Sequence, residues 1–180
     1  MKHKILLNNC IILCCLLFSG CEDIYNKCTT LYFRNNTDYQ ISVYWELFPP
    51  QNPPSPTVYP DTTLPGICPY LNIRRLDSHS SQRYSCLDSD YQTLYNAYNV
   101  DTISIFVFST DTLYFYGWPT VQKSYKILQR YDLSIEDCQR LSEKSGQRAL
   151  YPCFPPSPEM KNMKMWPPYG TYDEHGNRVK

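Results

Sequence analysis

Residues 101–108 read DTISIFVF, and this stretch decides the fold class that the sequence predicts. Ile103, Ile105 and Val107 alternate along one face of a β-strand, while Phe106 and Phe108 fall on the other face. A strand that is apolar on both faces is expected inside a fold, with another layer covering each side. The sequence therefore predicts a layered domain built around this strand.

Two strands are expected upstream, at Thr30–Arg34 and Tyr39–Glu46. In the second, apolar and polar side chains alternate with a period of two, as in a half-buried strand. The four polar residues between them, Asn35 to Asp38, have the composition of a hairpin turn. We therefore expect these two strands to pair as a hairpin.

Downstream of the central strand, residues 109–112 have the composition of a turn. A short helix is then expected over residues 118–125, with Pro119 near its start. Residues 126–132 are predicted to return as a strand. A second helix begins at Ser134, whose hydroxyl can cap the helix while Asp137 completes a capping box.

Composition agrees with a β-rich chain that has stiff connections. The sequence contains 15 Pro against 6 Gly, together with 17 Tyr, 7 Phe and 3 Trp. These features together predict a mainly β (α+β) fold, with an antiparallel sheet or sandwich-like single domain and two or three short helices.

The first 21 residues, MKHKILLNNCIILCCLLFSGC, have the layout of a secretory signal peptide. A basic start precedes an apolar run that is shorter than the roughly 20 residues a membrane-spanning helix needs. The segment Leu17–Cys21 resembles the lipobox of bacterial lipoproteins, and this resemblance implies cleavage before Cys21 and acylation of that cysteine. An ordinary cleaved signal and an uncleaved anchor are the alternatives.

This resemblance, together with the pattern of expected strands and helices, gives a predicted organisation and location. Residues 1–20 are the signal peptide, 21–27 a lipidated tether, 28–153 a single β-rich domain, and 154–180 a Pro- and Met-rich C-terminal tail docked on that domain. The expected location is the cell envelope, with a lipid anchor in a membrane, most simply the outer membrane. Glu22 and Asp23 resemble surface-export signals only in part, so the periplasmic and surface-exposed faces both stay open.

Charge balance argues against nucleic acid as a partner. The chain carries 17 basic and 17 acidic residues, and loss of Lys2 and Lys4 with the leader leaves a slight acidic excess. The expected partners are therefore a membrane, through the lipid anchor, and an envelope protein or a glycan.

Five of the nine cysteines lie beyond the leader and Cys21: Cys28, Cys68, Cys86, Cys138 and Cys153. Disulfides are permitted outside the inner membrane, so these five cysteines are expected to form two disulfides and to leave one free thiol. Cys138 is the expected free thiol, because it shares an apolar helix face with Ile135 and Leu141. No metal site is expected, because the spacing of Cys68, His79 and Cys86 fits no standard zinc pattern.

The run DTISIFVFSTDTLYFYGWPTVQKSYKILQRYDLSIEDCQRL, residues 101–141, resembles a family of small envelope lipoproteins of the Bacteroidota. The resemblance rests on two Asp-Thr pairs, a Tyr-x-Trp helix entry and the Tyr-Lys-Ile-Leu-x-Arg-Tyr-Asp-Leu segment. Tyr151-Pro152 and Met163–Asp173 also look like that family. The resemblance implies an envelope location and assigns no activity.

Three Asp-Thr sites also resemble an O-glycosylation motif of Bacteroidota envelope proteins. The acceptors would be Thr62, Thr102 and Thr112. Thr62 lies beside a proline-rich segment and is the best candidate for an exposed acceptor. Thr102 and Thr112 flank a predicted strand, where turn formation is the alternative role.

No catalytic or cofactor-binding residues are predicted. The chain lacks the GxSxG, HExxH and phosphate-binding Gly-rich patterns. Asp101 and Asp111 are conceivable as a carboxylate pair for glycoside cleavage, but capping of turns is the favoured reading. We therefore expect a non-catalytic structural or interaction role, with no cofactor.

The alternative is a carbohydrate- or host-ligand-binding surface lipoprotein that uses exposed aromatic residues. Its candidates are Tyr91, Tyr95 and Tyr98, or Trp166 with Tyr169. The spacing of the three tyrosines also fits a helix face packed on the sheet, and that reading is preferred.

Overall fold

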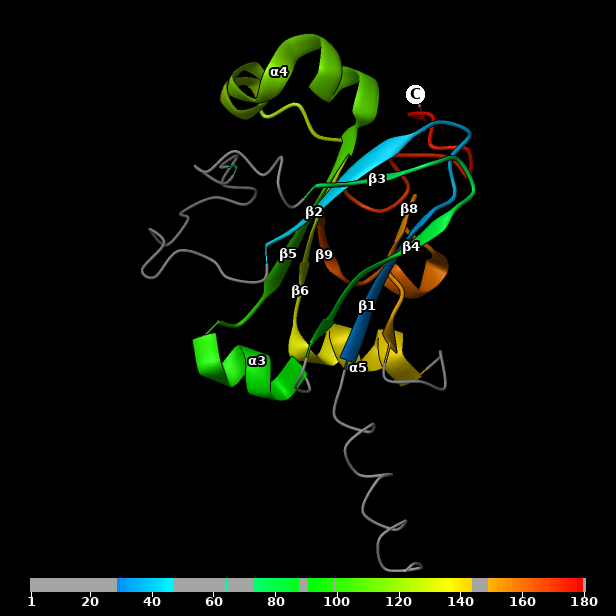
Figure 1. The fold of residues 1–180 in the computed structure, drawn as a ribbon. Coiled ribbons are helices and arrows are strands. Elements are labelled where there is room, and N and C mark those ends of the chain that lie inside the picture. The colour runs from blue at the N-terminus through cyan, green and yellow to red at the C-terminus, as the bar shows by residue number, and fades with distance from the viewer. Residues whose placement is uncertain are drawn as a thin grey trace, which may run out of the picture.

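The computed structural model describes residues 29–46, 64, 73–87, 91–98, 100–143 and 149–179, and it has two sheets with helices at both ends (Figure 1). One sheet has the order β4-β1-β7, with β8 also paired to β1. The other has the order β3-β2-β5-β6-β9. Strands β7 and β8 run parallel to β1, and the remaining pairs are antiparallel. The mainly β (α+β) fold class is thus confirmed.

The strands and helices have the following bounds. The first sheet contains β1 (Thr29–Asn35), β4 (Ser81–Leu87), β7 (Ala149–Leu150) and β8 (Cys153–Phe154). The second contains β2 (Ile41–Glu46), β3 (Arg74–Leu76), β5 (Ile103–Ser109), β6 (Gln129–Leu133) and β9 (Lys164–Trp166). The helices are α3 (Tyr91–Tyr98), α4 (Thr110–Ser124), α5 (Ile135–Glu143) and the short 3-10 helix η2 (Pro158–Met160).

Strand β5 lies at the centre of the five-stranded sheet and is covered on both faces, as its sequence predicts. Ile103, Ile105 and Val107 belong to the main core, which includes residues of both sheets and of α5. Phe106 and Phe108 belong to a second cluster, in which α4 covers the outer face of the sheet.

The predicted hairpin between the first two strands is wrong. Strand β1 pairs with β4, β7 and β8, whereas β2 pairs with β3 and β5, so the two strands belong to different sheets. The polar residues between them form a corner instead of a tight turn. Asn35 is buried there, and its side-chain amide donates to the carbonyl oxygens of Tyr39, Leu76 and Asp77.

The connection between β3 and β4 bends at the same corner as the connection between β1 and β2. Strands β3 and β4 also belong to different sheets, and each pairs with the matching half of the β1–β2 segment. Together the four strands form one long antiparallel ribbon that bends at residues 35–40 and 77–80. Period-two alternation in β2 correctly indicates a strand, but it carries no information on which strand becomes its neighbour.

Helix α4 starts earlier than predicted. Residues 110–116, the first of which are expected to form a turn, instead form the first part of the helix, and the Ser109 hydroxyl accepts from the Thr112 amide at 3.3 Å. Gly117 then leaves the helical region with φ 70° and ψ 159°, and the helix resumes at Trp118. Tyr125 ends it in a left-handed conformation, close to the predicted end.

Helix α5 confirms the predicted cap and buried face. The Asp137 amide donates to the Ser134 hydroxyl at 3.2 Å, and the Asp137 carboxylate accepts from the Ser134 amide at 3.1 Å. This is a capping box with aspartate in place of glutamate. Cys138 and Leu141 are buried in the main core, against which Ile135 also packs.

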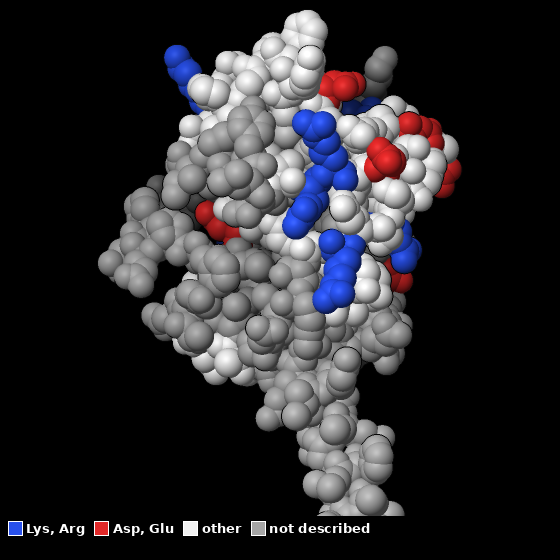
Figure 2. Space-filling view, in the orientation of Figure 1, with Lys and Arg blue, Asp and Glu red and all other residues white. Residues whose placement is uncertain are grey.

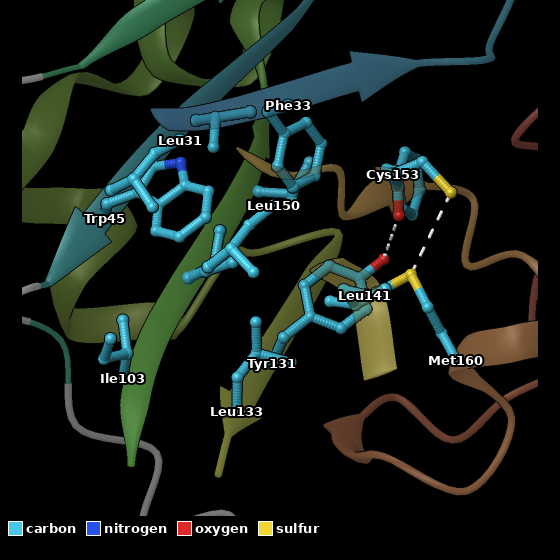
Figure 3. Packing of buried hydrophobic residues seen from close by; sticks show 14 of the residues in the cluster. Leu31, Phe33, Trp45, Ile103, Tyr131, Leu133, Leu141, Leu150, Cys153 and Met160 are labelled. Carbon is cyan, nitrogen blue, oxygen red and sulfur yellow. Dashed lines mark hydrogen bonds between the residues drawn. The ribbon is translucent and has the colours of Figure 1, made fainter. Parts of the chain in front are cut away.

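The C-terminal segment supplies a substantial part of the core. Met160, Met163 and Met165 are buried there, and β9 forms the edge of the five-stranded sheet. Figure 3 shows Cys153 Sγ pointing toward Met160 Sδ, 3.9 Å away, beside the bond from the Tyr131 hydroxyl to the Cys153 carbonyl oxygen.

The expected two disulfides are contradicted. Cys138 is free and buried as predicted, but Cys153 is also free and buried. With two thiols of the five unpaired, at most one disulfide can form among the other three. Cys28 and Cys68 lie outside the described residues, as does the Cys86 side chain.

Candidate functional site

Helix α4 presents three consecutive aromatic residues to solvent. Tyr114 is 86 % exposed, Phe115 84 % and Tyr116 51 %. On either side, Leu113 and Trp118 are buried against the sheet, and the Trp118 ring meets Phe108 edge-on at 5.9 Å. The two buried residues hold the aromatic segment at the surface, so its exposure follows from how α4 is anchored.

These rings have specific contacts. Phe115 and Tyr116 meet edge-to-face, with ring centroids 5.9 Å apart. The Lys126 ammonium lies 4.8 Å from the centroid of the Tyr116 ring, a cation–π geometry. Exposed apolar groups of this kind are typical of surfaces that bind a partner or a ligand.

A pocket of about 160 Å³ lies beside this segment, between α4 and the edge strand β3. It is lined by Ser42, Ile73, Arg75, Thr110, Leu113, Tyr114 and Gly117. The walls combine apolar groups, one tyrosine ring, one guanidinium and two aliphatic hydroxyls. The hydroxyl oxygens of Ser42 and Thr110 are 2.9 Å apart and share a hydrogen bond.

Arg75 gives this pocket its charge. It stands opposite Ser42 in the β2–β3 ladder, which places both side chains on the outer face of the sheet. Arg74, one residue earlier, stands opposite the core residue Val43 and so faces the other way. Figure 2 shows basic side chains gathered over the region of β3 and β4, with acidic ones toward the edge where the C-terminus lies.

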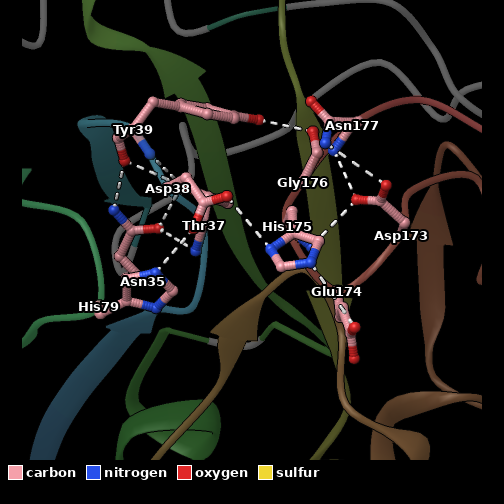
Figure 4. Close-up of polar contacts among 10 residues, drawn as sticks. All are labelled: Asn35, Thr37, Asp38, Tyr39, His79, Asp173, Glu174, His175, Gly176 and Asn177. Atoms are coloured by element: carbon pink, nitrogen blue, oxygen red, sulfur yellow. Dashed lines mark hydrogen bonds and ion pairs between the residues drawn. The ribbon is translucent and has the colours of Figure 1, made fainter.

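A second cluster lies at the corner between β1 and β2, where two histidines meet one carboxylate (Figure 4). His79 Nε2 lies 2.8 Å from Asp38 Oδ1, and His175 Nδ1 lies 3.1 Å from Asp38 Oδ2. Asp38 joins the β3–β4 turn to the C-terminal turn. All three side chains are more than half exposed, so the ion pairs add little to stability.

Hydrogen bonds hold the C-terminal turn on this corner. The Tyr39 hydroxyl donates to the Gly176 carbonyl oxygen at 2.7 Å, and burial, reinforced by Tyr172 and Asp173, raises the pKa of Tyr39 to about 12. Backbone donation from Asn177 lowers the pKa of Asp173. Within the part of the chain that the structure describes, no group of three metal-ligating side chains is assembled. The contacts that the cluster does make join the C-terminal turn to the corner between β1 and β2.

The contact of His79 and His175 with the same carboxylate, Asp38, has no signal in the sequence. The two histidines are 96 residues apart in the numbering and no local pattern links them. The aromatic segment of α4 did carry a visible pattern: aromatic residues at 114, 115, 116 and 118 cannot all face one side of a helix. Such a run indicates rings left at the surface.

The predicted modification sites are only partly within the described residues. Cys21 and Thr62 lie outside them. Thr102 is half-buried, and its hydroxyl donates to the Asp101 carboxylate at 3.3 Å. Thr112 is half-buried in the first turn of α4. Lipidation and glycosylation remain predictions. Among the described helices, none is long and apolar enough to cross a membrane.

The aromatic candidates from sequence separate into core and surface residues. Tyr95 is buried, and its hydroxyl donates to the Leu133 carbonyl oxygen. The side chains of Tyr91 and Tyr98 lie outside the described set. Trp166 is half-buried against Tyr125, with ring centroids 5.5 Å apart, and Tyr169 is exposed. Among the described residues, the most exposed rings are instead those of α4.

Asp101 and Asp111 do not form a carboxylate pair. They lie at opposite ends of β5, a strand of seven residues, and a strand advances about 3.4 Å per residue. Paired glycosidase carboxylates lie within about 10 Å of each other, so these two are too far apart. Asp111 instead occupies the first turn of α4, where a negative charge is favourable.

Comparison with known proteins yields no relative: no family model, no curated protein and no solved structure matches this chain.

Proposed function

We propose that this chain is a lipid-anchored protein of the cell envelope, held in a membrane through acyl chains on Cys21, with a non-catalytic interaction role. The lipobox-like segment before Cys21 supports the anchor. Two or more acyl chains suffice for stable attachment, since each buried methylene contributes about 0.8 kcal/mol.

The observation that carries the interaction role is the position of the exposed aromatic rings. Strand β1 begins at the end of the molecule that holds α3 and α5, and α4 lies at the opposite end (Figure 1). A chain tethered just before β1 can therefore present Tyr114, Phe115 and Tyr116 away from its anchoring membrane. This arrangement suits a domain that meets a partner at its far end.

Replacing the proposed acylated cysteine tests the anchor. Cys21→Ser should release the protein from the membrane fraction without changing its circular dichroism, and the intact mass should lose the acyl chains. Cys138→Ser is the matched control, because it also removes a thiol but leaves Cys21 in place. Retention of Cys21→Ser in the membrane fraction would refute lipid anchoring.

A second candidate function is carbohydrate binding by the exposed aromatic residues. It is favoured by the α4 rings lying beside a pocket with hydroxyl and guanidinium groups. Replacing Tyr114, Phe115 and Tyr116 together by Ser should abolish binding on a glycan array, whereas Tyr169→Ser, another exposed ring, should not. An array on which the unaltered protein binds no glycan would eliminate this candidate.

A further inference from the structure

The pocket between α4 and β3 has the size of one small ring. Its volume is about 160 Å³, close to the roughly 150 Å³ of an engineered protein cavity that takes up benzene. Ile73 and Leu113 supply apolar wall, and the Tyr114 ring stands at the margin, largely exposed. An aromatic ring there can lie against the apolar face of a ligand ring.

Among the described residues that line the pocket, Arg75 is the one that carries a charge. It is exposed, and no hydrogen bond or ion pair joins its guanidinium to any of the described residues. A guanidinium offers donors in a planar fork that matches the two oxygens of a carboxylate. The charge of the pocket is therefore complementary to a carboxylated ligand.

Ser42 and Thr110 add neutral polar groups. Each hydroxyl has one donor and two acceptor positions, and the single bond between them uses one donor and one acceptor. Ser42 is buried, with 1 % of its surface exposed, so its hydroxyl serves to position Thr110. The half-buried Thr110 hydroxyl keeps at least one acceptor position for a ligand that carries hydroxyls of its own. A simple aliphatic acid, such as a glutamate side chain, would leave the Thr110 hydroxyl unused.

We propose that this pocket binds a carboxylated sugar ring, namely a uronic acid unit of a glycan. Arg75 pairs with the carboxylate, the Thr110 hydroxyl, held by Ser42, bonds to a ring hydroxyl, and Tyr114 packs on the apolar face of the sugar. This inference rests on the carbohydrate-binding candidate above and specifies the chemical class of the ligand.

The test is a titration of the full-length protein, solubilised in detergent, by isothermal calorimetry. Methyl glucuronide should bind at least about tenfold more tightly than methyl glucoside, because a hydrogen-bonded charged group contributes that much or more. Benzoate and the acetylated, amidated tripeptide Ala-Glu-Ala should bind more weakly than the glucuronide. Equal binding of the two sugars, or preferred binding of benzoate or the tripeptide, would overturn the proposal.

Neighbouring arginines provide a matched pair of variants. Arg75→Gln should weaken glucuronide binding about tenfold or more and leave the glucoside unaffected. Arg74→Gln lies on the same strand but on the other face, and it should bind the glucuronide as before. Equal losses of glucuronide affinity in both variants would show that the affinity comes from general surface charge, and this result would refute the proposed binding in the pocket. Circular dichroism confirms that each variant is folded, and Arg75→Lys should recover part of the affinity.

The outcome also separates this inference from the functions it builds on. If the glycan array shows binding of neutral glycans with no preference for acidic ones, carbohydrate binding stands and the uronic acid pocket fails. If the array is negative, both fail, while membrane anchoring through Cys21 is decided independently by fractionation.

Discussion

Asn35 determines how the chain turns from one sheet to the other. Its amide nitrogen donates to three backbone carbonyl oxygens, those of Tyr39 at 2.8 Å, Leu76 at 3.3 Å and Asp77 at 2.9 Å. Its carbonyl oxygen accepts from the amide and the hydroxyl of Thr37, at 3.0 and 2.8 Å. One side chain thus satisfies polar groups on both strands of the bent ribbon.

Asn35→Ala should lower the free energy of unfolding by about 3 kcal/mol, because buried acceptors lose their donor and each unsatisfied group costs about 1–3 kcal/mol. Urea denaturation followed by circular dichroism measures this loss. Asn36→Ala is the control, since the Asn36 contact at this corner is made by its backbone amide, which donates to the Phe154 carbonyl oxygen at 2.8 Å. Equal unfolding midpoints for the two variants would contradict the role given to Asn35.

The pocket residues show why a binding site of this kind is hard to predict at the residue scale. Ser42, Arg75 and Thr110 come from three elements, and the sheet register brings them together. None of the three residues belongs to a sequence motif. In the sequence alone, nothing distinguishes them from other polar residues of the chain. The exposed aromatic run beside them was the only local indication.

At the scale of elements, those with local information were predictable. Helix α5 has its cap and its buried face within nine consecutive residues, and β5 has apolar side chains on both faces. The first part of α4 was missed because its exposed aromatic residues follow no amphipathic pattern. Its helical state instead depends on Leu113 and Trp118 packing on the sheet.

The C-terminal turn offers a test of docking between elements. Gly176 and Gly170 have nearly the same positive φ, 83° and 85°. A Cβ on Gly176 would collide with Thr37 Cγ2 and lie 2.8 Å from the Tyr39 hydroxyl oxygen, whereas a Cβ on Gly170 would meet nothing within 4 Å. The two positions therefore share backbone strain and differ in available space.

Gly176→Ala should destabilise the protein by about 2 kcal/mol more than Gly170→Ala, because overpacking adds to the strain that both variants share. Thermal denaturation of the two variants measures the difference. Hydrogen exchange should also show that the amide of Val179, which donates to the Thr171 carbonyl oxygen, loses more protection in Gly176→Ala. If both variants lose the same stability, the C-terminal turn is not packed on the corner.

At the scale of the whole molecule, the sequence predicted the fold class but not the partition into sheets. Alternation along a strand specifies which residues face the core, but it does not specify the neighbouring strand. Pairing of β1 with β2, as predicted, and pairing with β4, as observed, both satisfy the alternation of β1. The choice is made by contacts distant in the chain, such as Asn35 with Asp77 and Arg34 with Cys153. The number of disulfides likewise depends on which cysteines the fold brings together, and the expected number of two was wrong.

Phenol and thiol groups buried in the core predict that the protein loses stability at alkaline pH. Burial raises the pKa of Tyr44 and of the Cys138 thiol to about 12, and raises the pKa of Tyr131 well above its ordinary value. In the unfolded chain the thiol releases its proton near pH 9 and the phenols near pH 10. Between these values and the raised ones, the unfolded state binds fewer protons, so the free energy of unfolding falls as pH rises.

These groups should therefore leave stability unchanged between about pH 7 and 8 and lower it between about pH 9 and 12, with each fully buried group contributing about 1.4 kcal/mol per pH unit. Urea denaturation at pH 8, 10 and 11 measures the slope. Tyr131→Phe removes one such group together with its bond to the Cys153 carbonyl oxygen, so it should be less stable at pH 8 but lose less stability on going to pH 11. Tyr114→Phe, which removes a hydroxyl at the surface, should keep the original slope. A free energy of unfolding that is the same at pH 8 and pH 11 would show that Tyr131 and Cys138 are not buried in the folded protein.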